Sequence, residues 1–306
     1  MINKEKTDIP HLVFLGSAAV TGLLVILMFG FIFWTAIPVF RLEGPGFILN
    51  SVWNYSTDQY GIFFFIIGTV IVTVATLILA IPLGLLTSIF LAEFAPAPIE
   101  RVFRPLIELL VGIPSIVYGL FGFLFLRYFF MDTIDPLMNR YFGFIPIFRN
   151  LDTGGGDHIL LAAVILTIMV LPTIVALSQD AMRSVPKEYR EGSLALGATR
   201  WETVTQVVIP AAWTGIVTSI ILAMMRAMGE TMAVVMVAGN SAQIPPTILS
   251  PVYPMTAKML NDVGSWAGIP MPRAALFGIA AVLFVIEILF VAGVRLLIRY
   301  AGRRIG

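Results

Sequence analysis

Long runs without a charged side chain dominate this chain. Asp, Glu, Lys and Arg are missing from residues 9–40, 59–92, 109–126, 158–179, 203–225 and 231–257. About 20 helical residues, each rising about 1.5 Å, cross a bilayer core of about 30 Å. The start of the last run continues the preceding one across Arg226 and Glu230, and residues 274–297 are apolar apart from Glu287 and Arg295. The pattern therefore predicts an all-α integral membrane protein with six transmembrane helices, at residues 12–37, 62–92, 106–129, 159–181, 214–239 and 274–298.

Prolines bear on the path of these spans. Pro82, Pro114 and Pro172 each remove a backbone donor inside a predicted helix. We interpret them as kinks, with hinges that let the bundle switch states as the alternative. On either interpretation Pro114, its neighbour Ser115, and Pro172 are candidate structural or gating positions. The proline-rich residues 243–254 cannot be helical, so the fifth span is expected to end before them.

The composition also indicates a membrane protein. Hydrophobic residues make up 58% of the chain and charged residues 12%, against roughly 25% charged residues in a typical globular protein. The net charge of +1 lacks the clustered basic excess that nucleic acid requires. Cysteine is missing, which excludes disulfides, thiolate metal sites and cysteine nucleophiles. The two histidines, His11 and His158, are assigned no role.

Basic residues set the expected orientation. Twelve Lys and Arg residues lie in the N-terminal tail, in the loops after the second and fourth spans and at the C-terminus, and six lie on the other side. The positive-inside rule makes the side with twelve cytoplasmic, so both termini are expected in the cytoplasm. The first apolar run is too long for a secretory signal and Phe33-Trp34-Thr35 offers no cleavage pattern, so we expect a retained helix.

The loop between the fourth and fifth spans, residues 184–210, carries helix signals throughout. A first helix is expected from Pro186 to Leu196, with Gly197 as its left-handed stop. Thr199 and Glu202 have the spacing of a capping box at the start of a second helix. The pattern predicts an amphipathic helical hairpin on the cytoplasmic face.

This loop resembles the EAA loop of ABC importer permeases. Glu191-Gly192-Ser193 is followed by three residues, Gly197, nine residues and then Val-Val-Ile-Pro at 207–210. The family pattern is Glu-Ala-Ala, three residues, Gly, nine residues and Ile-x-Leu-Pro, so Gly192 and Ser193 depart from its two alanines. The resemblance implies a coupling helix that docks into the ATPase subunit, although a hairpin without a partner is the alternative. The docking residues would be Glu191, Gly192, Ser193, Gly197, Ala198 and Thr199.

Two further stretches resemble phosphate permeases of the PstC type. Residues 108–119 look like their third-span signature, and residues 226–240, followed by Ile244-Pro-Pro, are closer to the PstC than to the sister PstA pattern. The resemblance runs from about Gly61 to the C-terminus. Residues 61–306 are therefore expected to form the permease domain, after an N-terminal region (residues 1–60) of tail, first span and external loop. Residues 127–157 carry little of the resemblance.

The resemblance implies a multi-pass subunit of the cell membrane that serves ATP-driven phosphate import. No Gly-x-x-x-x-Gly-Lys-Ser/Thr loop is present, so ATP and magnesium are expected on a partner. We expect no catalytic residue, metal or cofactor in this chain. The implied partners are a PstA-type permease, a PstB-type ATPase dimer, a PstS-type extracytoplasmic phosphate-binding protein, phosphate and membrane lipid. A permease for another oxyanion, such as molybdate or sulfate, and a secondary anion transporter are the alternatives.

Charged residues inside the predicted spans are candidates for the substrate path. Arg226 is expected about 20 Å from the inner surface, where exposure to lipid costs at least about 2.5–3.5 kcal/mol. Glu230 follows at the i,i+4 spacing, so a structural ion pair is one interpretation. The other is a path formed by Arg226, Glu230 and Thr231, in which the guanidinium binds phosphate and Glu230 neutralises it when the path is empty. Glu287 is another acid inside a predicted span, with Arg226 and Arg295 as candidate partners between which the sequence does not choose.

Labelling from the two sides of the membrane tests the orientation. Because the chain lacks cysteine, Ser184→Cys and Asn139→Cys each introduce its single thiol. We expect Asn139→Cys to react with an impermeant maleimide in intact cells, and Ser184→Cys to react only after the membrane is opened. Reaction of both from outside would contradict six spans with both termini inside.

Overall fold

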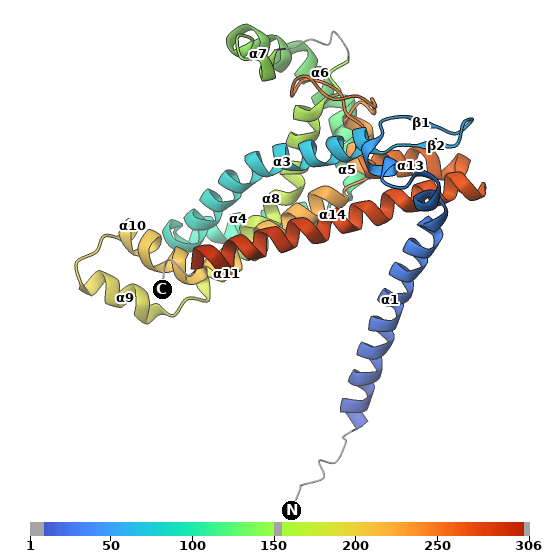
Figure 1. Ribbon diagram of the computed structural model, residues 1–306. Coiled ribbons are helices and arrows are strands. Elements are labelled where there is room, and N and C mark those ends of the chain that lie inside the picture. Colours follow the sequence, from blue (N-terminus) through green and yellow to red (C-terminus); the bar gives the residue numbers. More distant parts are fainter. Residues whose placement is uncertain (1–8, 150–154, 303–306) are drawn as a thin grey trace, which may run out of the picture. The chain divides into compact units, whose positions relative to one another are not determined.

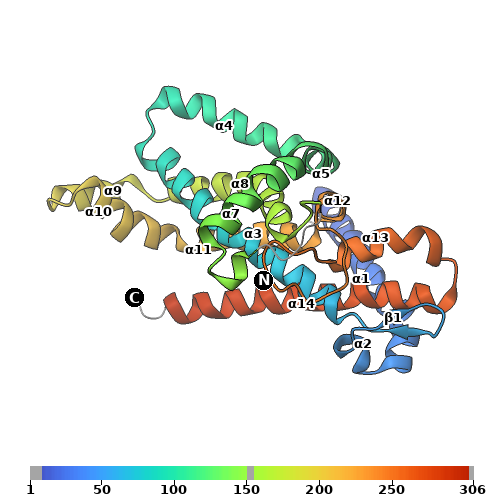
Figure 2. The ribbon, with the colours of Figure 1, turned by 90° about the horizontal axis from the view of Figure 1, so that it is seen from above.

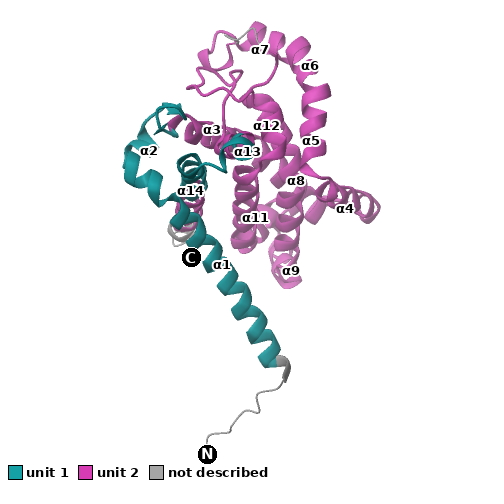
Figure 3. Ribbon diagram, turned by 90° about the vertical axis from the view of Figure 1, so that its right-hand side faces the viewer, with its two compact units in different colours: residues 1–62, 262–282 teal, residues 63–261, 283–306 magenta. Residues whose placement is uncertain are grey.

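The computed structural model describes residues 9–149 and 155–302. Four basic residues of the orientation argument, Lys4, Lys6, Arg303 and Arg304, lie outside these ranges. The described chain divides into two compact units (Figure 3): unit 1 comprises residues 9–62 and 262–282, and unit 2 comprises residues 63–149, 155–261 and 283–302. The last helix begins in unit 1 and continues in unit 2.

Helices make up most of the described chain (Figure 1). The long ones are α1 (Ile9–Glu43), α3 (Phe63–Ile89) with the π-helical turn η1 (Phe90–Phe94), α8 (Ile159–Arg183) and α14 (Pro270–Gly302). Two more are continuous runs of short pieces: α5 (Ser115–Phe121), η2 (Gly122–Leu126), α6 (Arg127–Phe129), η3 (Phe130–Ile134) and α7 (Asp135–Phe142); and α10 (Arg200–Thr203), η5 (Val204–Val208) and α11 (Ile209–Gly229). The remaining elements are α2 (Gly46–Leu49), β1 (Trp53–Asn54), β2 (Gln59–Tyr60), α4 (Ala97–Gly112), η4 (Pro146–Phe148), α9 (Lys187–Ala195), α12 (Met232–Val237) and α13 (Met255–Trp266).

Six helices in the described ranges are long and apolar enough to cross a membrane. This number confirms the prediction of six spans in an all-α membrane protein. Four of the predicted spans agree with the structure to within a few residues, and the third and fifth do not. The six helices are His11–Glu43, Phe63–Phe94, Ser115–Phe142, Ile159–Arg183, Arg200–Gly229 and Pro270–Leu296.

The predicted bounds of the third span, residues 106–129, are wrong, because the helix is interrupted within them. Ile113 (ψ 125°) and Pro114 (ψ 140°) are extended, so α4 ends and α5 begins there. A proline pushes the preceding residue out of the helical region, which accounts for the break. The Tyr118 hydroxyl donates a hydrogen bond to the Leu110 carbonyl at 2.9 Å and satisfies one acceptor near the end of α4. The membrane-length helix therefore starts at Ser115.

Helix α4 lies at the edge of unit 2 (Figure 2) and buries none of its residues. Its charged side chains hold it to the end of α8, because Arg104 ion-pairs with Asp180 at 3.6 Å and Glu100 ion-pairs with Arg183. Its exposed apolar side chains include Val102, Phe103, Leu106 and Leu109. The amphipathic pattern of α4 is typical of a helix along a membrane surface rather than across it.

The fifth span, predicted at residues 214–239, is also interrupted. Helix α11 ends at Gly229, Glu230 is extended (ψ 128°), and α12 follows after one more residue. The Thr256 hydroxyl donates to the Glu230 carbonyl at 2.8 Å, across 26 residues of sequence. Apolar periodicity does not reveal such a break, because the residue that satisfies it lies far along the chain. Residues 243–254 are non-helical, as predicted.

Helix α8 lies at the centre of unit 2, and 67% of its most apolar 18-residue stretch is buried. It packs against α3 and α11. The Ser178 and Ser219 hydroxyls join α8 to α11 at 2.7 Å, and the Thr167 hydroxyl donates to the Thr76 carbonyl of α3 at 3.3 Å. Hydroxyl bonds of this kind are typical of helix interfaces in membranes. Both α3 and α8 continue past their internal prolines, Pro82 and Pro172, so neither proline breaks its helix.

His158 has a structural role that the sequence did not reveal. It lies just before α8, where its Nδ1 accepts a hydrogen bond from the Leu161 backbone at 3.2 Å and caps the helix. Its Nε2 lies 3.1 Å from the Asp135 carboxylate, and both side chains are buried. This pair ties α7 to the start of α8.

Unit 1 is held together largely by aromatic contacts. Tyr55 stacks on Trp266 with ring centroids 3.9 Å apart, and its hydroxyl contacts the Asp262 carboxylate. Phe31 of α1 meets Phe277 of α14 edge to face at 5.4 Å. These contacts join the start of the chain to residues more than 200 positions later. Unit 1 is therefore assembled from two segments that are distant in sequence.

Close packing of α3 on α8 predicts a large effect at Gly84. A Cβ atom there would lie 2.6 Å from Ile174 Cγ2. We expect Gly84→Leu to destabilise the protein by about 1–3 kcal/mol, the usual cost of overpacking, measured as thermal unfolding in detergent. Gly22→Leu is the control, because nothing lies within 4 Å of a Cβ atom on Gly22 of α1. Equal unfolding temperatures for the two variants would contradict this packing.

Candidate functional site

The predicted hairpin is present and is capped as expected. Helix α9 begins after Pro186 and ends before Leu196, and Gly197 has a positive φ of 88°. Thr199 and Glu202 form the complete capping box: the Thr199 backbone N–H donates to the Glu202 carboxylate at 2.7 Å, and the Glu202 N–H donates to Thr199 Oγ1 at 3.3 Å. We call residues 186–203 the hairpin. Its arms, α9 and α10, lie beside each other beyond the end of α8 (Figure 1).

Gly192 and Ser193, which replace the two alanines of the family pattern, have different surroundings. The Ser193 hydroxyl lies 2.9 Å from the Thr203 hydroxyl and joins the two arms of the hairpin. A Cβ atom on Gly192 would meet nothing within 4 Å. Glu191 and Gly192 are exposed, and Ala198 is half-buried beside Gly197. The structure therefore leaves the start of the motif accessible to a partner.

Exposed apolar side chains on the hairpin were missed by the sequence analysis. Leu196 is 91% exposed, Tyr189 58% and Trp201 57%. These three side chains offer apolar contact area to another protein or to a membrane. The sequence did carry one sign of this exposure: the apolar residue Leu196 directly precedes Gly197, the helix stop, at the tip of the hairpin.

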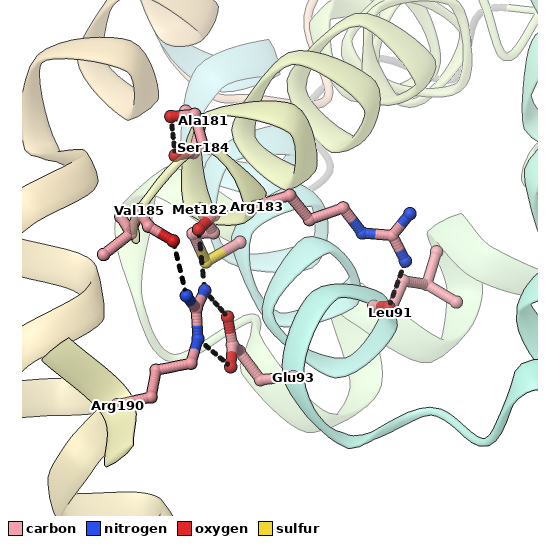
Figure 4. Close-up of polar contacts among 8 residues, drawn as sticks. All are labelled: Leu91, Glu93, Ala181, Met182, Arg183, Ser184, Val185 and Arg190. Carbon is pink, nitrogen blue, oxygen red and sulfur yellow. Dashed lines mark hydrogen bonds and ion pairs between the residues drawn. The ribbon is translucent and has the colours of Figure 1, made fainter. Parts of the chain in front are cut away.

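The base of the hairpin holds an ion pair that the sequence analysis also missed. Arg190 of α9 contacts the Glu93 carboxylate of η1 through two nitrogens, at 2.7 and 3.2 Å (Figure 4). Nearby, Arg183 donates to the Leu91 carbonyl. A hollow of about 340 Å³ lies beside the pair, lined by Ala92, Glu93, Arg183, Lys187, Arg190 and Glu191. Because 97 residues separate Arg190 from Glu93, no local pattern could predict this contact.

The break after α11 changes the expected geometry of Arg226 and Glu230. One oxygen of the Glu230 carboxylate accepts hydrogen bonds from the backbone N–H groups of Thr231 (3.1 Å) and Ala233 (3.3 Å). The Thr231 hydroxyl donates to the Gly229 carbonyl at 3.2 Å. Glu230 thus caps the turn into α12, and the i,i+4 helical pair with Arg226 is not formed.

Arg226 is half-buried one turn before the end of α11. Within residues 9–149 and 155–302 it makes no hydrogen bond or ion pair. Glu287 pairs with neither Arg226 nor Arg295 in those ranges. Glu287 lines a groove of about 830 Å³ together with Thr214, Thr218 and Arg295. The Arg226 guanidinium therefore has hydrogen-bond donors available near the end of α11.

The third-span candidates lie next to α12. Pro114 and Ser115 start α5, and one turn later a Cβ atom on Gly119 would lie 2.9 Å from Ala233 Cα. This close approach brings the two interrupted segments together. Pro172 is buried inside α8. No cluster of three or more metal-ligating side chains occurs among the described residues.

Comparison with known families accounts for this combination of six spans, hairpin and broken helices. Residues 80–306 match the family described as "Binding-protein-dependent transport system inner membrane component". The chain belongs to this family. It is therefore a multi-pass membrane protein and an inner membrane component of a transport system.

Curated relatives cover most of the chain. A protein of Bacillus subtilis (strain 168), "Probable ABC transporter permease protein YqgH", is 38% identical over 84% of this chain and 77% of its own length. The "Phosphate transport system permease protein PstC" of Mesorhizobium japonicum is 36% identical over 89% of this chain and 83% of its own length. The PstC of Pasteurella multocida is 34% identical over 87% of this chain and 83% of its own.

A solved structure supports the fold. A chain of the MetNI methionine ABC transporter, in an inward-facing conformation, superposes with a TM-score of 0.51 and 16% sequence identity. The match covers 80% of this chain and 94% of that chain. The fold is therefore that of an ABC importer permease.

Proposed function

We propose that this chain is the PstC-like permease subunit of an ATP-driven phosphate importer in the plasma membrane. The observation that carries the proposal is its similarity, over nearly the whole chain, to proteins named as phosphate transport system permeases. The chain supplies part of the translocation path. ATP and magnesium bind to a separate PstB-type ATPase dimer, and this chain holds no cofactor.

The hairpin is the contact with that ATPase. Its exposed apolar side chains offer a contact surface, and the positive-inside rule predicts that the hairpin and both termini are cytoplasmic. Glu191, Gly192, Ser193, Gly197, Ala198 and Thr199 form the motif part of the docking surface. A PstA-type permease completes the path, and a PstS-type binding protein delivers phosphate from outside.

Arg226 attracts the phosphate anion within the membrane. Its guanidinium carries five donors in a planar fork that matches two oxygens of an oxyanion, and no protein carboxylate neutralises it in the described ranges. Glu230 and Thr231 shape the adjacent turn. An unpaired cation of this kind must face water, substrate or protein rather than lipid.

Two other functions are alternatives. A permease for molybdate or sulfate would use the same guanidinium, and the names of the relatives support phosphate over both. A self-contained secondary transporter would have no use for an exposed docking hairpin. Uptake of labelled phosphate into ATP-loaded vesicles containing the four subunits, with sulfate and molybdate as competitors, separates the candidates. Competition by sulfate or molybdate equal to that by phosphate would contradict the assignment.

Gly197 provides a test of the hairpin. Its φ of 88° costs a residue with a Cβ atom about 1–2 kcal/mol, and a β-branched side chain suffers most. We expect Gly197→Val to insert in the membrane but to lose phosphate uptake and transport-stimulated ATP hydrolysis.

Two variants serve as controls for that substitution. Gly197→Asn should retain activity, because Asn tolerates the left-handed conformation. Gly192→Ala restores an alanine of the family pattern at a position where a Cβ atom meets nothing within 4 Å in this chain, so it should retain uptake. Normal uptake by Gly197→Val would rule out a role for this turn in coupling.

Arg226 can be tested separately from its neighbours. Because it has no ion pair to lose, Arg226→Met should assemble normally but transport phosphate poorly. Arg226→Lys should also be impaired, since an ammonium lacks the planar fork. Adding Glu230→Gln to Arg226→Met should not restore uptake, measured per assembled complex in vesicles. Full recovery by the double variant would show a structural charge balance instead.

A further inference from the structure

Arg190 attaches the hairpin to the membrane helices of unit 2. Its Nε and Nη2 atoms donate to the two oxygens of Glu93, at 3.2 and 2.7 Å. Its Nη1 donates to the Val185 carbonyl at 2.7 Å, and Nη2 also donates to the Met182 carbonyl at 2.8 Å. Figure 4 shows the guanidinium lying between these three residues. One side chain thus joins α9, the end of α3 and the end of α8.

The burial of this contact makes it a rigid one. The Arg190 and Glu93 side chains are 20% and 10% exposed, so salt and water screen the pair little. Two parallel charge-assisted hydrogen bonds also fix the direction of the guanidinium, which a single contact would not do. By comparison, Arg104 and Glu108 are 45% and 61% exposed, and pairs of that kind contribute little.

The connection would otherwise be weak. Between α8 and α9 only residues 184–186 link the hairpin to the bundle on this side, and Pro186 is extended with ψ 143°. The two carbonyls bound by Arg190 belong to the last turn of α8 and to this connection, and the Met182 carbonyl also accepts the Val185 N–H at 3.2 Å. A cation at a helix C-terminus is also favourable to the helix dipole. The hydrogen bonds of Arg190 therefore restrict bending at residues 184–186, between α8 and α9.

We propose that Arg190 is a positioning residue for coupling: it makes the hairpin move together with the adjoining ends of α3 and α8. Displacement of the hairpin by the ATPase then reaches both membrane helices instead of being absorbed at residues 184–186. This inference rests on the proposed docking of the hairpin to an ATPase, and it adds the route by which the movement leaves the hairpin.

The test uses the complete transporter in vesicles, with ATPase retention, ATP hydrolysis and phosphate uptake measured on the same samples. We expect Arg190→Met to retain the ATPase and to hydrolyse ATP, but to import about tenfold less phosphate per ATP, the size reached by substitutions within coupling networks. Glu93→Gln should give the same defect. The double variant should be no worse than either single variant, because all three remove one interaction.

Arg183→Met is the matched control. Arg183 forms an ion pair with Glu100 of α4 and donates to the Leu91 carbonyl, and among the described residues no hydrogen bond or ion pair joins its side chain to the hairpin. We expect this variant to lower thermal stability while leaving phosphate import per ATP unchanged. A purely stabilising role for Arg190 would make the two arginine variants alike, and that result would overturn the inference.

A covalent link gives an independent readout. In this cysteine-free chain, Glu93→Cys with Arg190→Cys can be joined by a short bismaleimide, with partner subunits that also lack cysteine. We expect cross-linking to raise import per ATP above that of the unlinked double variant. Wild-type coupling in Arg190→Met, or loss of the ATPase from it, would overturn the positioning role. Failure of the wild-type complex to bind an ATPase would instead refute the proposed function itself.

Discussion

A backbone that crosses hydrocarbon must satisfy its own hydrogen bonds, because no water is available to do so. The same demand applies at the two breaks within the predicted third and fifth spans, which lie at the ends of the membrane-length helices Ser115–Phe142 and Arg200–Gly229. At Ile113–Pro114 the Tyr118 hydroxyl reaches back to the Leu110 carbonyl. At Glu230 the carboxylate takes two N–H groups of the next helix, and Thr256 takes the freed carbonyl. Broken helices are tolerated here because side chains of the same unit replace the missing helical bonds.

The same constraint assigns different roles to similar charges. One oxygen of the Glu230 carboxylate accepts two backbone N–H groups, and Arg226 pairs with no carboxylate in the described chain. Arg190, at the base of the hairpin, has its donors filled by one carboxylate and two carbonyls. A guanidinium whose donors are bonded to protein oxygens stabilises the structure, whereas one with unbonded donors can bind an anion. This contrast separates the proposed roles of the two arginines, Arg190 in positioning the hairpin and Arg226 in the candidate path.

Individual elements show which structural features short-range sequence patterns could predict. The hairpin was predicted down to its cap, because Gly197, Thr199 and Glu202 act through contacts within a few residues. The break at residues 113–114 was open to prediction, since a proline disfavours helix at the preceding residue. The break at Glu230 was not, because its stabilising partner, Thr256, lies 26 residues away. The Arg190–Glu93 contact, 97 residues apart, was equally hidden.

The sequence by itself determined the number of spans, the all-α class, the capped hairpin and the family pattern within it. These features depend on hydrophobic run length and on spacings of a few residues, which the chain carries locally. Only the tertiary structure decided which intramembrane charge is free, where two of the spans break and which residue anchors the hairpin. Those outcomes depend on hydrogen-bond partners supplied from distant segments, and in a low-dielectric interior the partner determines whether a polar group is structural or available.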